Sequence, residues 1–181
     1  MNKMQKPTNL KAGATTAPTA LATPTDLTPD EVRAVADAVN PLIADSFALY
    51  LKTKNFHWHL SGRRFRDLHL LFDKQATDIF AAIDPLAERL RKIGATTMRS
   101  IAHVSEKQTI ADDNEDFVTP DDMVARLLAD NRHIAKAMRD AIKVAEDSRD
   151  SPTENLLEEL LDKTERRTWF LFEITQDGNR A

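Results

Sequence analysis

Hydrophobic positions recur at intervals of three and four residues through most of this chain. The clearest series follows Ser61-Gly62 and comprises Phe65, Leu68, Phe72, Ala76, Ile79, Phe80, Ile83, Leu86, Ala87 and Leu90. Such spacing is typical of an amphipathic helix that buries one face. Gly94 follows the series and provides a residue suited to ending that helix.

Three further helices are predicted from a shared start signal. A Thr or Ser is followed by proline and, at the third helical position, by an acid, at Thr28, Thr119 and Ser151. The hydroxyl can cap the helix, proline needs no N–H at the first position, and the acid lies near the positive end of the helix dipole. We therefore predict helices over residues 29–59, 64–93, 120–148 and 152–175.

Two prolines lie inside these predicted helices. Pro41 and Pro85 each remove a backbone donor and clash with the preceding turn, so we expect a kink or a break near them. Six shorter helices are the alternative arrangement.

The lengths of the connections predict the topology. Roughly four residues join the first pair and about three the last pair, which makes each pair antiparallel. About 26 residues join the second helix to the third, enough to run the ~45 Å length of a 30-residue helix. We predict an all-α fold, a four-helix bundle with one long crossover between helices 2 and 3, as in ferritin-like folds.

Composition limits the domain organisation. Residues 1–27 lack a core-forming pattern and are expected to be a disordered tail rich in Lys, Ala, Thr and Pro, with a signal peptide as the alternative. Residues 28–176 form the bundle and 177–181 a short second tail. With 30% charged residues, we expect no membrane-spanning segment. The absence of cysteine excludes disulfides and thiolate ligands and fits the cytoplasm.

Net charge limits nucleic-acid binding to a local site. The chain has 25 Lys and Arg against 29 Asp and Glu, so the bundle should repel phosphate. The tail is different because it holds Lys3, Lys6 and Lys11 and no acid. Binding through several such tails would weaken strongly with salt.

Candidate chemistry gathers on one face of the second predicted helix. At about 100° per residue, and with His69 at zero, Asp73 lies near 40°, Asp84 near 60° and Glu88 near 100°. Imidazoles and carboxylates without sulfur suit divalent iron, manganese or zinc. His69 and Glu88 are about 28 Å apart along the helix axis, so one chain cannot bring both to one ion. A site would need two chains related by a two-fold axis.

Other interpretations of these residues remain open. Four polar residues on one helix face are also what a solvated surface looks like. An ordinary di-iron bundle would show Glu-x-x-His on two helices, and this sequence has none. We expect His103 and His133 to be surface or structural residues.

The chain resembles the Dps family, the miniferritins, over about residues 28–175. The resemblance rests on four segments: Lys54-Asn55-Phe56-His57-Trp58-His59, Ser61-Gly62, Phe65-x-x-Leu68-His69-x-x-Phe72-Asp73 and Asp84-x-x-Ala87-Glu88-Arg89. It implies a hollow dodecamer built from dimers, with ferroxidase sites at the dimer interfaces. Fe(II) would be oxidised, preferentially by hydrogen peroxide, and stored as a ferric mineral without an organic cofactor.

The resemblance also assigns roles to residues. It implies that His57 and His69 of one subunit and Asp84 and Glu88 of another bind iron, with Asp73 assisting. Trp58 would flank the site, although a core aromatic is the alternative. Many members have Asn where this chain has His59, which makes His59 an extra ligand, a partner of a ligand or a plain surface residue. The acids expected to line a pore are Glu146, Asp150 and Glu154, with ordinary capping and solvated residues as the alternative interpretation.

Two rival functions follow from other features. The lysine tail favours a nucleoid-packing DNA-binding protein that has the cage but little iron chemistry. A metal-free helical interaction module would have neither property. Pro85, directly after Asp84, leaves open whether the acidic half of the site keeps its geometry.

Overall fold

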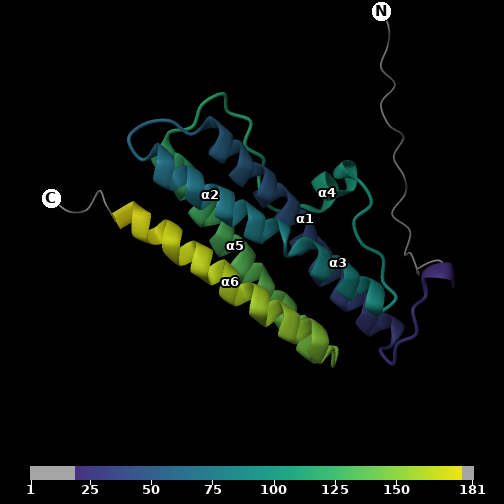
Figure 1. Ribbon diagram of the computed structural model, residues 1–181. Coiled ribbons are helices and arrows are strands. Elements are labelled where there is room, and N and C mark those ends of the chain that lie inside the picture. The colour runs from purple at the N-terminus through teal and green to yellow at the C-terminus, as the bar shows by residue number, and fades with distance from the viewer. Residues whose placement is uncertain (1–18, 177–181) are drawn as a thin grey trace, which may run out of the picture.

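The described part of the chain, residues 19–176 of the computed structural model, consists of helices and connecting loops. A short 3-10 helix, η1, covers Thr19–Leu21. It is followed by six α-helices: α1 Pro29–His59, α2 Phe65–Phe80, α3 Ile83–Lys92, α4 Ile101–Lys107, α5 Pro120–Asp147 and α6 Ser151–Thr175. α2 and α3 follow one another along one line and together take the place of one helix of the bundle (Figure 1). The other three helices of the bundle are α1, α5 and α6, and the small α4 lies outside it. This is the expected ferritin-like four-helix bundle.

The helix starts follow their capping residues. Thr28 accepts a hydrogen bond from the Glu31 amide, and the Glu31 carboxylate accepts one from the Thr28 amide. Thr119 caps α5 through the Asp122 amide. The third start differs from the prediction, because Asp150, not Ser151, is the N-cap of α6. A carboxylate one residue upstream satisfies the same orphan amides as a hydroxyl.

The two internal prolines behave differently. α1 runs through Pro41 as one helix of 31 residues, so the expectation of a break there is wrong. The helix expected over residues 64–93 is instead broken at Ala81 and Ala82, which separate α2 from α3. Pro85 then lies in the first turn of α3, where its missing N–H costs no intrahelical bond.

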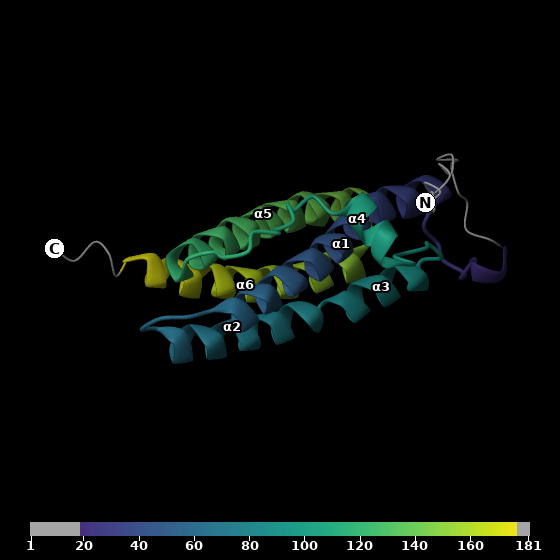
Figure 2. The same cartoon turned by 90° about the horizontal axis from the view of Figure 1, so that it is seen from above.

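The core lies along α1, the central helix. It packs against α2 and α3 on one side and α5 on the other, while α6 pairs with α5 (Figure 2). The largest fully buried side chains include Leu42, Leu49 and Phe56 of α1, Phe72 of α2 and Leu127 of α5. α1 is long and apolar enough to cross a membrane, since an 18-residue stretch of it has a mean hydropathy of 1.2. Core helices of soluble proteins have the same length and composition, and 44% of this stretch is buried inside the bundle.

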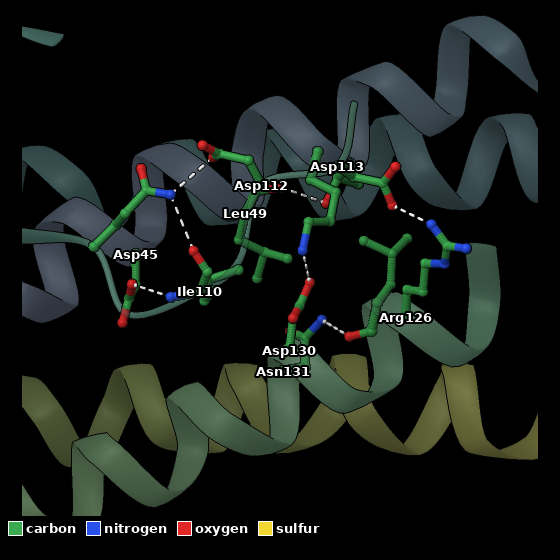
Figure 3. A network of polar contacts seen from close by, with 12 residues as sticks. Asp45, Leu49, Ile110, Asp112, Asp113, Arg126, Asp130 and Asn131 are labelled. Atoms are coloured by element: carbon green, nitrogen blue, oxygen red, sulfur yellow. Dashed lines mark hydrogen bonds and ion pairs between the residues drawn. The ribbon is translucent and has the colours of Figure 1, made fainter. Parts of the chain in front are cut away.

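The crossover between α3 and α5 runs back along the bundle and includes α4, a helix that the sequence pattern did not predict. It is fastened to α1 by the buried Asp45, whose carboxylate accepts hydrogen bonds from the Thr109 and Ile110 amides (Figure 3). Arg126 of α5 binds Asp113 of the crossover at 2.7 Å. These contacts let α5 begin at the end of the bundle where α1 ends.

Residues 19–27 lie against the end of α3. The Thr23 hydroxyl donates to the Arg91 carbonyl at 2.8 Å, and the Arg91 guanidinium donates to the Leu21 carbonyl at 2.9 Å. Leu27 packs on the edge of the core. The tail expected over residues 1–27 therefore includes a segment that contacts the bundle, while residues 1–18 and 177–181 lie outside the described residues.

Candidate metal centre

His57 and His69 form a closely coupled pair between α1 and α2. Their rings stack with centroids 3.7 Å apart and planes 20° from parallel. The His57 Nδ1 lies 2.9 Å from the His69 carbonyl oxygen, and the His69 Nδ1 lies 3.1 Å from the His57 carbonyl oxygen. A carbonyl oxygen only accepts, so each Nδ1 carries the hydrogen. In the neutral form of each ring, Nε2 then keeps a lone pair that can bind a metal ion.

The turn between the helices creates this pairing. α1 ends at His59, and α2 begins at Phe65 after a short connection in which Gly62 adopts a φ of 101°. That left-handed conformation favours glycine. The turn brings the last turn of α1 beside the second turn of α2, and the Phe65 ring stacks on His69 with centroids 4.9 Å apart. His57 is buried, so its position is fixed by packing.

Asp73 lies one turn beyond His69, at the edge of the histidine pair. Its Oδ1 is 4.0 Å from the His57 Nε2 and 2.7 Å from the Lys54 Nζ. The hydrogen bond from Lys54, and then its positive charge, lower the pKa of Asp73, which keeps this carboxylate ionised. Asp73 thus lies near the histidine pair, and its assisting role in metal binding stays a prediction. Lys54 lies three residues before His57 in the sequence, and this spacing alone does not predict its contact with Asp73.

The two other residues near the pair lie at its margin. The Trp58 side chain is 58% exposed, so it is not a core aromatic, and the Lys54 Nζ lies 5.9 Å from its ring centroid. His59 is exposed and its Nδ1 bonds to the Asn55 carbonyl at 2.9 Å. Two positions along a helix turn a side chain by about 200°, which explains why His59 does not join His57.

Asp84 and Glu88 share a face of α3, one turn apart, and both are exposed. Glu88 faces Lys92 at 3.5 Å. Within residues 19–176 no three His, Asp or Glu side chains come together as a metal site would require. The histidines and these two acids are therefore separate halves on one chain, in agreement with the separation predicted from the helix geometry.

The three expected pore acids differ in their surroundings. Glu146 is exposed and Glu154 half-buried near the α5–α6 turn. Asp150 is buried, and its carboxylate binds Arg89 at 2.5 Å and Thr153 at 2.5 Å. Asp150 therefore has the capping role that the alternative interpretation expects, while its place at a pore between subunits stays a prediction.

The remaining histidines and the tail lie apart from the site. His133 contacts the Thr109 hydroxyl at 2.6 Å, and His103 lies in α4, which fits structural roles. Lys3, Lys6 and Lys11 lie outside the described residues.

Comparisons with known proteins agree with this architecture. Residues 36–181 match the family described as the ferritin-like domain. "DNA protection during starvation protein 1" of Deinococcus radiodurans is 31% identical over 147 residues, covering 81% of this chain and 71% of the relative.

Two solved structures show the same arrangement of helices. A Dps homologue of the archaeon Halobacterium salinarum superposes with a TM-score of 0.82 at 27% identity, covering 96% of this chain and 94% of the other. A Dps protein of Vibrio cholerae O1, grouped with the ferritin-like diiron-carboxylate proteins, gives 0.78 at 26% identity, covering 84% and 96%. The chain described here belongs to the Dps family of ferritin-like proteins.

Proposed function

We propose that this protein oxidises Fe(II) and stores the ferric product inside a homo-oligomeric cage, protecting DNA from iron-driven oxidative damage. The observation that carries the proposal is the His57–His69 pair, in which both Nε2 atoms are left free to bind a metal ion. Neutral imidazoles with carboxylates are a ligand set that suits Fe(II).

A second copy of the chain completes the proposed site. The histidine half lies where α1 meets α2, and Asp84 and Glu88 lie on the exposed face of α3. A two-fold axis would bring the histidines of each copy against the acids of the other and create two equivalent sites per dimer. We expect the dimers to assemble into a dodecamer, with Glu146 and Glu154 near the pores through which iron enters.

Hydrogen peroxide is the proposed oxidant. Each Fe(II) loses one electron, and one peroxide takes up two electrons and two protons to become two waters. The protein would bind Fe(II) through imidazole and carboxylate groups, with Asp73, 4.0 Å from the His57 Nε2, assisting beside the pair. Trp58, exposed at the margin, would contact the neighbouring copy.

Anaerobic loading tests the proposal. The purified protein is given Fe(II) without oxygen, then hydrogen peroxide, and ferric absorbance is recorded against protein-free buffer. We expect faster oxidation with iron kept in solution, and loss of this acceleration in Asp84→Ala/Glu88→Ala. If the double variant oxidises iron as fast as the wild type, the proposed function is wrong.

DNA packing is the second candidate, favoured by the acid-free sequence around Lys3, Lys6 and Lys11. Deleting residues 1–18, which removes the three lysines and keeps the contacts of Leu21 and Thr23 with Arg91, separates the two functions. DNA compaction should disappear while iron oxidation continues, and compaction should weaken steeply with salt. The cysteine-free composition fits a protein of the reducing cytoplasm.

A further inference from the structure

α3 carries the acidic half of the proposed site, and few directional contacts fix its orientation besides the bonds that Arg91, at its end, makes with Leu21 and Thr23. It has only 10 residues, and its buried residues are Ile83, Leu86 and Leu90. At the break before it, neither the α2 end at Ala81 nor the α3 start at Ala82 has a side-chain cap. Apolar packing resists separation of α3 from the core more than it resists rotation about the helix axis, because it is not directional.

Arg89, directly after Glu88, supplies a directional contact to α6. Its Nη2 donates to the Asp150 Oδ1 at 2.5 Å, and its Nε donates to the Thr153 Oγ1 at 2.8 Å. The Thr153 hydroxyl in turn donates to the Asp150 Oδ2 at 2.5 Å. These bonds close a ring of three side chains, and both partners of Arg89 are buried.

Asp150, the partner of Arg89 in this ring, is itself fixed by several contacts. Asp150 caps α6 through the Thr153 amide, and its own amide donates to the Ala145 carbonyl at 2.8 Å. The preceding Arg149 adopts a φ of 58°, in the left-handed region, and binds Glu31 at the start of α1. Arg89 is therefore tied to the junction of α5 and α6, the closely packed half of the bundle.

We propose that Arg89, through Asp150 and Thr153, is a positioning residue that sets the rotation of α3 and so aims Asp84 and Glu88 at the histidine pair of a neighbouring copy. The inference rests on the proposed function. A carboxylate lies about 5–6 Å from the helix axis, so a rotation of about 20° moves it by about 2 Å. Metal–ligand distances tolerate only about 0.2 Å.

Co(II) binding to the assembled full-length protein tests this proposal without requiring iron oxidation. Arg89→Lys keeps the charge but cannot form the fork, and Asp150→Asn keeps a capping residue but removes the carboxylate. We expect both to weaken Co(II) binding by about tenfold or more and to change its visible absorption spectrum. Thr153→Val should give a smaller loss, and Thr153→Ser should restore wild-type binding.

Asp130→Asn is the matched control. Asp130 binds Lys52 at 2.6 Å across α1 and α5, another largely buried ion pair, but one that does not touch α3. Sedimentation and the thermal midpoint are recorded for every variant. We expect Asp130→Asn to lower the thermal midpoint while leaving Co(II) affinity and spectrum unchanged.

Equal behaviour of the Arg89 and Asp130 variants would overturn the proposal, because Arg89 would then be a structural contact only. Should Arg89→Lys and Asp150→Asn fail to assemble, Thr153→Val decides, since it removes two bonds of the ring and keeps the ion pair. Unchanged Co(II) binding in Thr153→Val then rejects the proposal. If the proposed function itself is wrong, Asp84→Ala/Glu88→Ala leaves Co(II) binding unaffected. That result distinguishes failure of the proposed function from failure of the role proposed for Arg89.

Discussion

His57 and His69 hold each other in place: the Nδ1 of each ring donates to the backbone carbonyl of the other residue, at 2.9 and 3.1 Å. The two bonds fix the tautomer and the tilt of both rings before any metal arrives. In many metal sites a separate carbonyl or carboxylate does this for each histidine. Here the two ligands do it for one another, so removing one ring also releases its partner.

This reciprocity predicts a shared loss of function. His57→Gln and His69→Gln should each reduce the initial rate of Fe(II) oxidation to below about a tenth of the wild-type rate. The double variant should be little worse than either single variant, because the two residues act as a unit. Stopped-flow absorbance of ferric products gives the rates. His59→Gln is the control, and a comparable loss there would argue against the assignment of the pair.

We expect that removing the Lys54 ammonium strengthens metal binding. Its ammonium occupies the Asp73 carboxylate that faces His57. Lys54→Met should free that carboxylate, raise its pKa towards the ordinary value and tighten Co(II) binding several-fold, because a competing cation is gone. Calorimetric titration measures the affinity. Lys54→Arg keeps the competing charge and should bind Co(II) like the wild type, so tightening in both variants would contradict this role.

We expect His103 to lower the free energy of unfolding in mild acid. Its Nδ1 is buried without a hydrogen-bond partner, and burial, followed by the charge of Arg99, lowers the pKa of the ring. The unfolded chain takes up a proton near pH 6.5 while the folded chain resists it. The free energy of unfolding should therefore fall as pH drops below about 6.5.

Denaturant unfolding between pH 7.5 and 5.5 checks that expectation. His103→Gln should flatten the pH dependence over this range, because the group that protonates on unfolding is gone. The exposed His59→Gln should keep the wild-type slope. An unchanged slope in His103→Gln would assign the pH dependence to other groups.

We expect substitutions of Arg167 and Asn131, which contact each other in the bundle interior, to have non-additive effects on the free energy of unfolding. Burial lowers the pKa of Arg167 to about 10, and its Nε donates to the Asn131 Oδ1 at 2.9 Å. Arg167→Met leaves that buried oxygen without a donor and should cost about 1–3 kcal/mol of unfolding free energy. Arg167→Met/Asn131→Leu removes both polar groups and should recover most of the loss.

Chemical denaturation of the two single variants and the double variant gives the coupling energy directly. Additive losses would mean that the contact contributes nothing beyond the packing of each side chain. Sedimentation checks that the variants and the wild type share the same state of assembly, since assembly also shifts apparent stability.

Local sequence signals determined where the helices of the bundle lie along the chain. Thr28, Thr119 and the acids that follow them satisfy their helix ends within one turn, and the period of apolar residues fixes which face is buried. The four main helices and the long crossover could be predicted because these signals act over three or four residues. The spacing of His69 and Glu88 likewise predicted two separate half-sites, since the rise of a helix is constant.

Only the tertiary structure decided which side chains join those helices to one another. The burial of Asp150 beneath Arg89 joins residues 61 positions apart, and the reciprocal bonds of His57 and His69 join residues 12 positions apart. The place of the break, at Ala81 and Ala82, was likewise set by the tertiary structure. A sequence pattern reports the spacing along one helix but carries no measure of which side chains meet across helices. Those meetings depend on how the buried faces pack, and packing is settled by the whole chain at once.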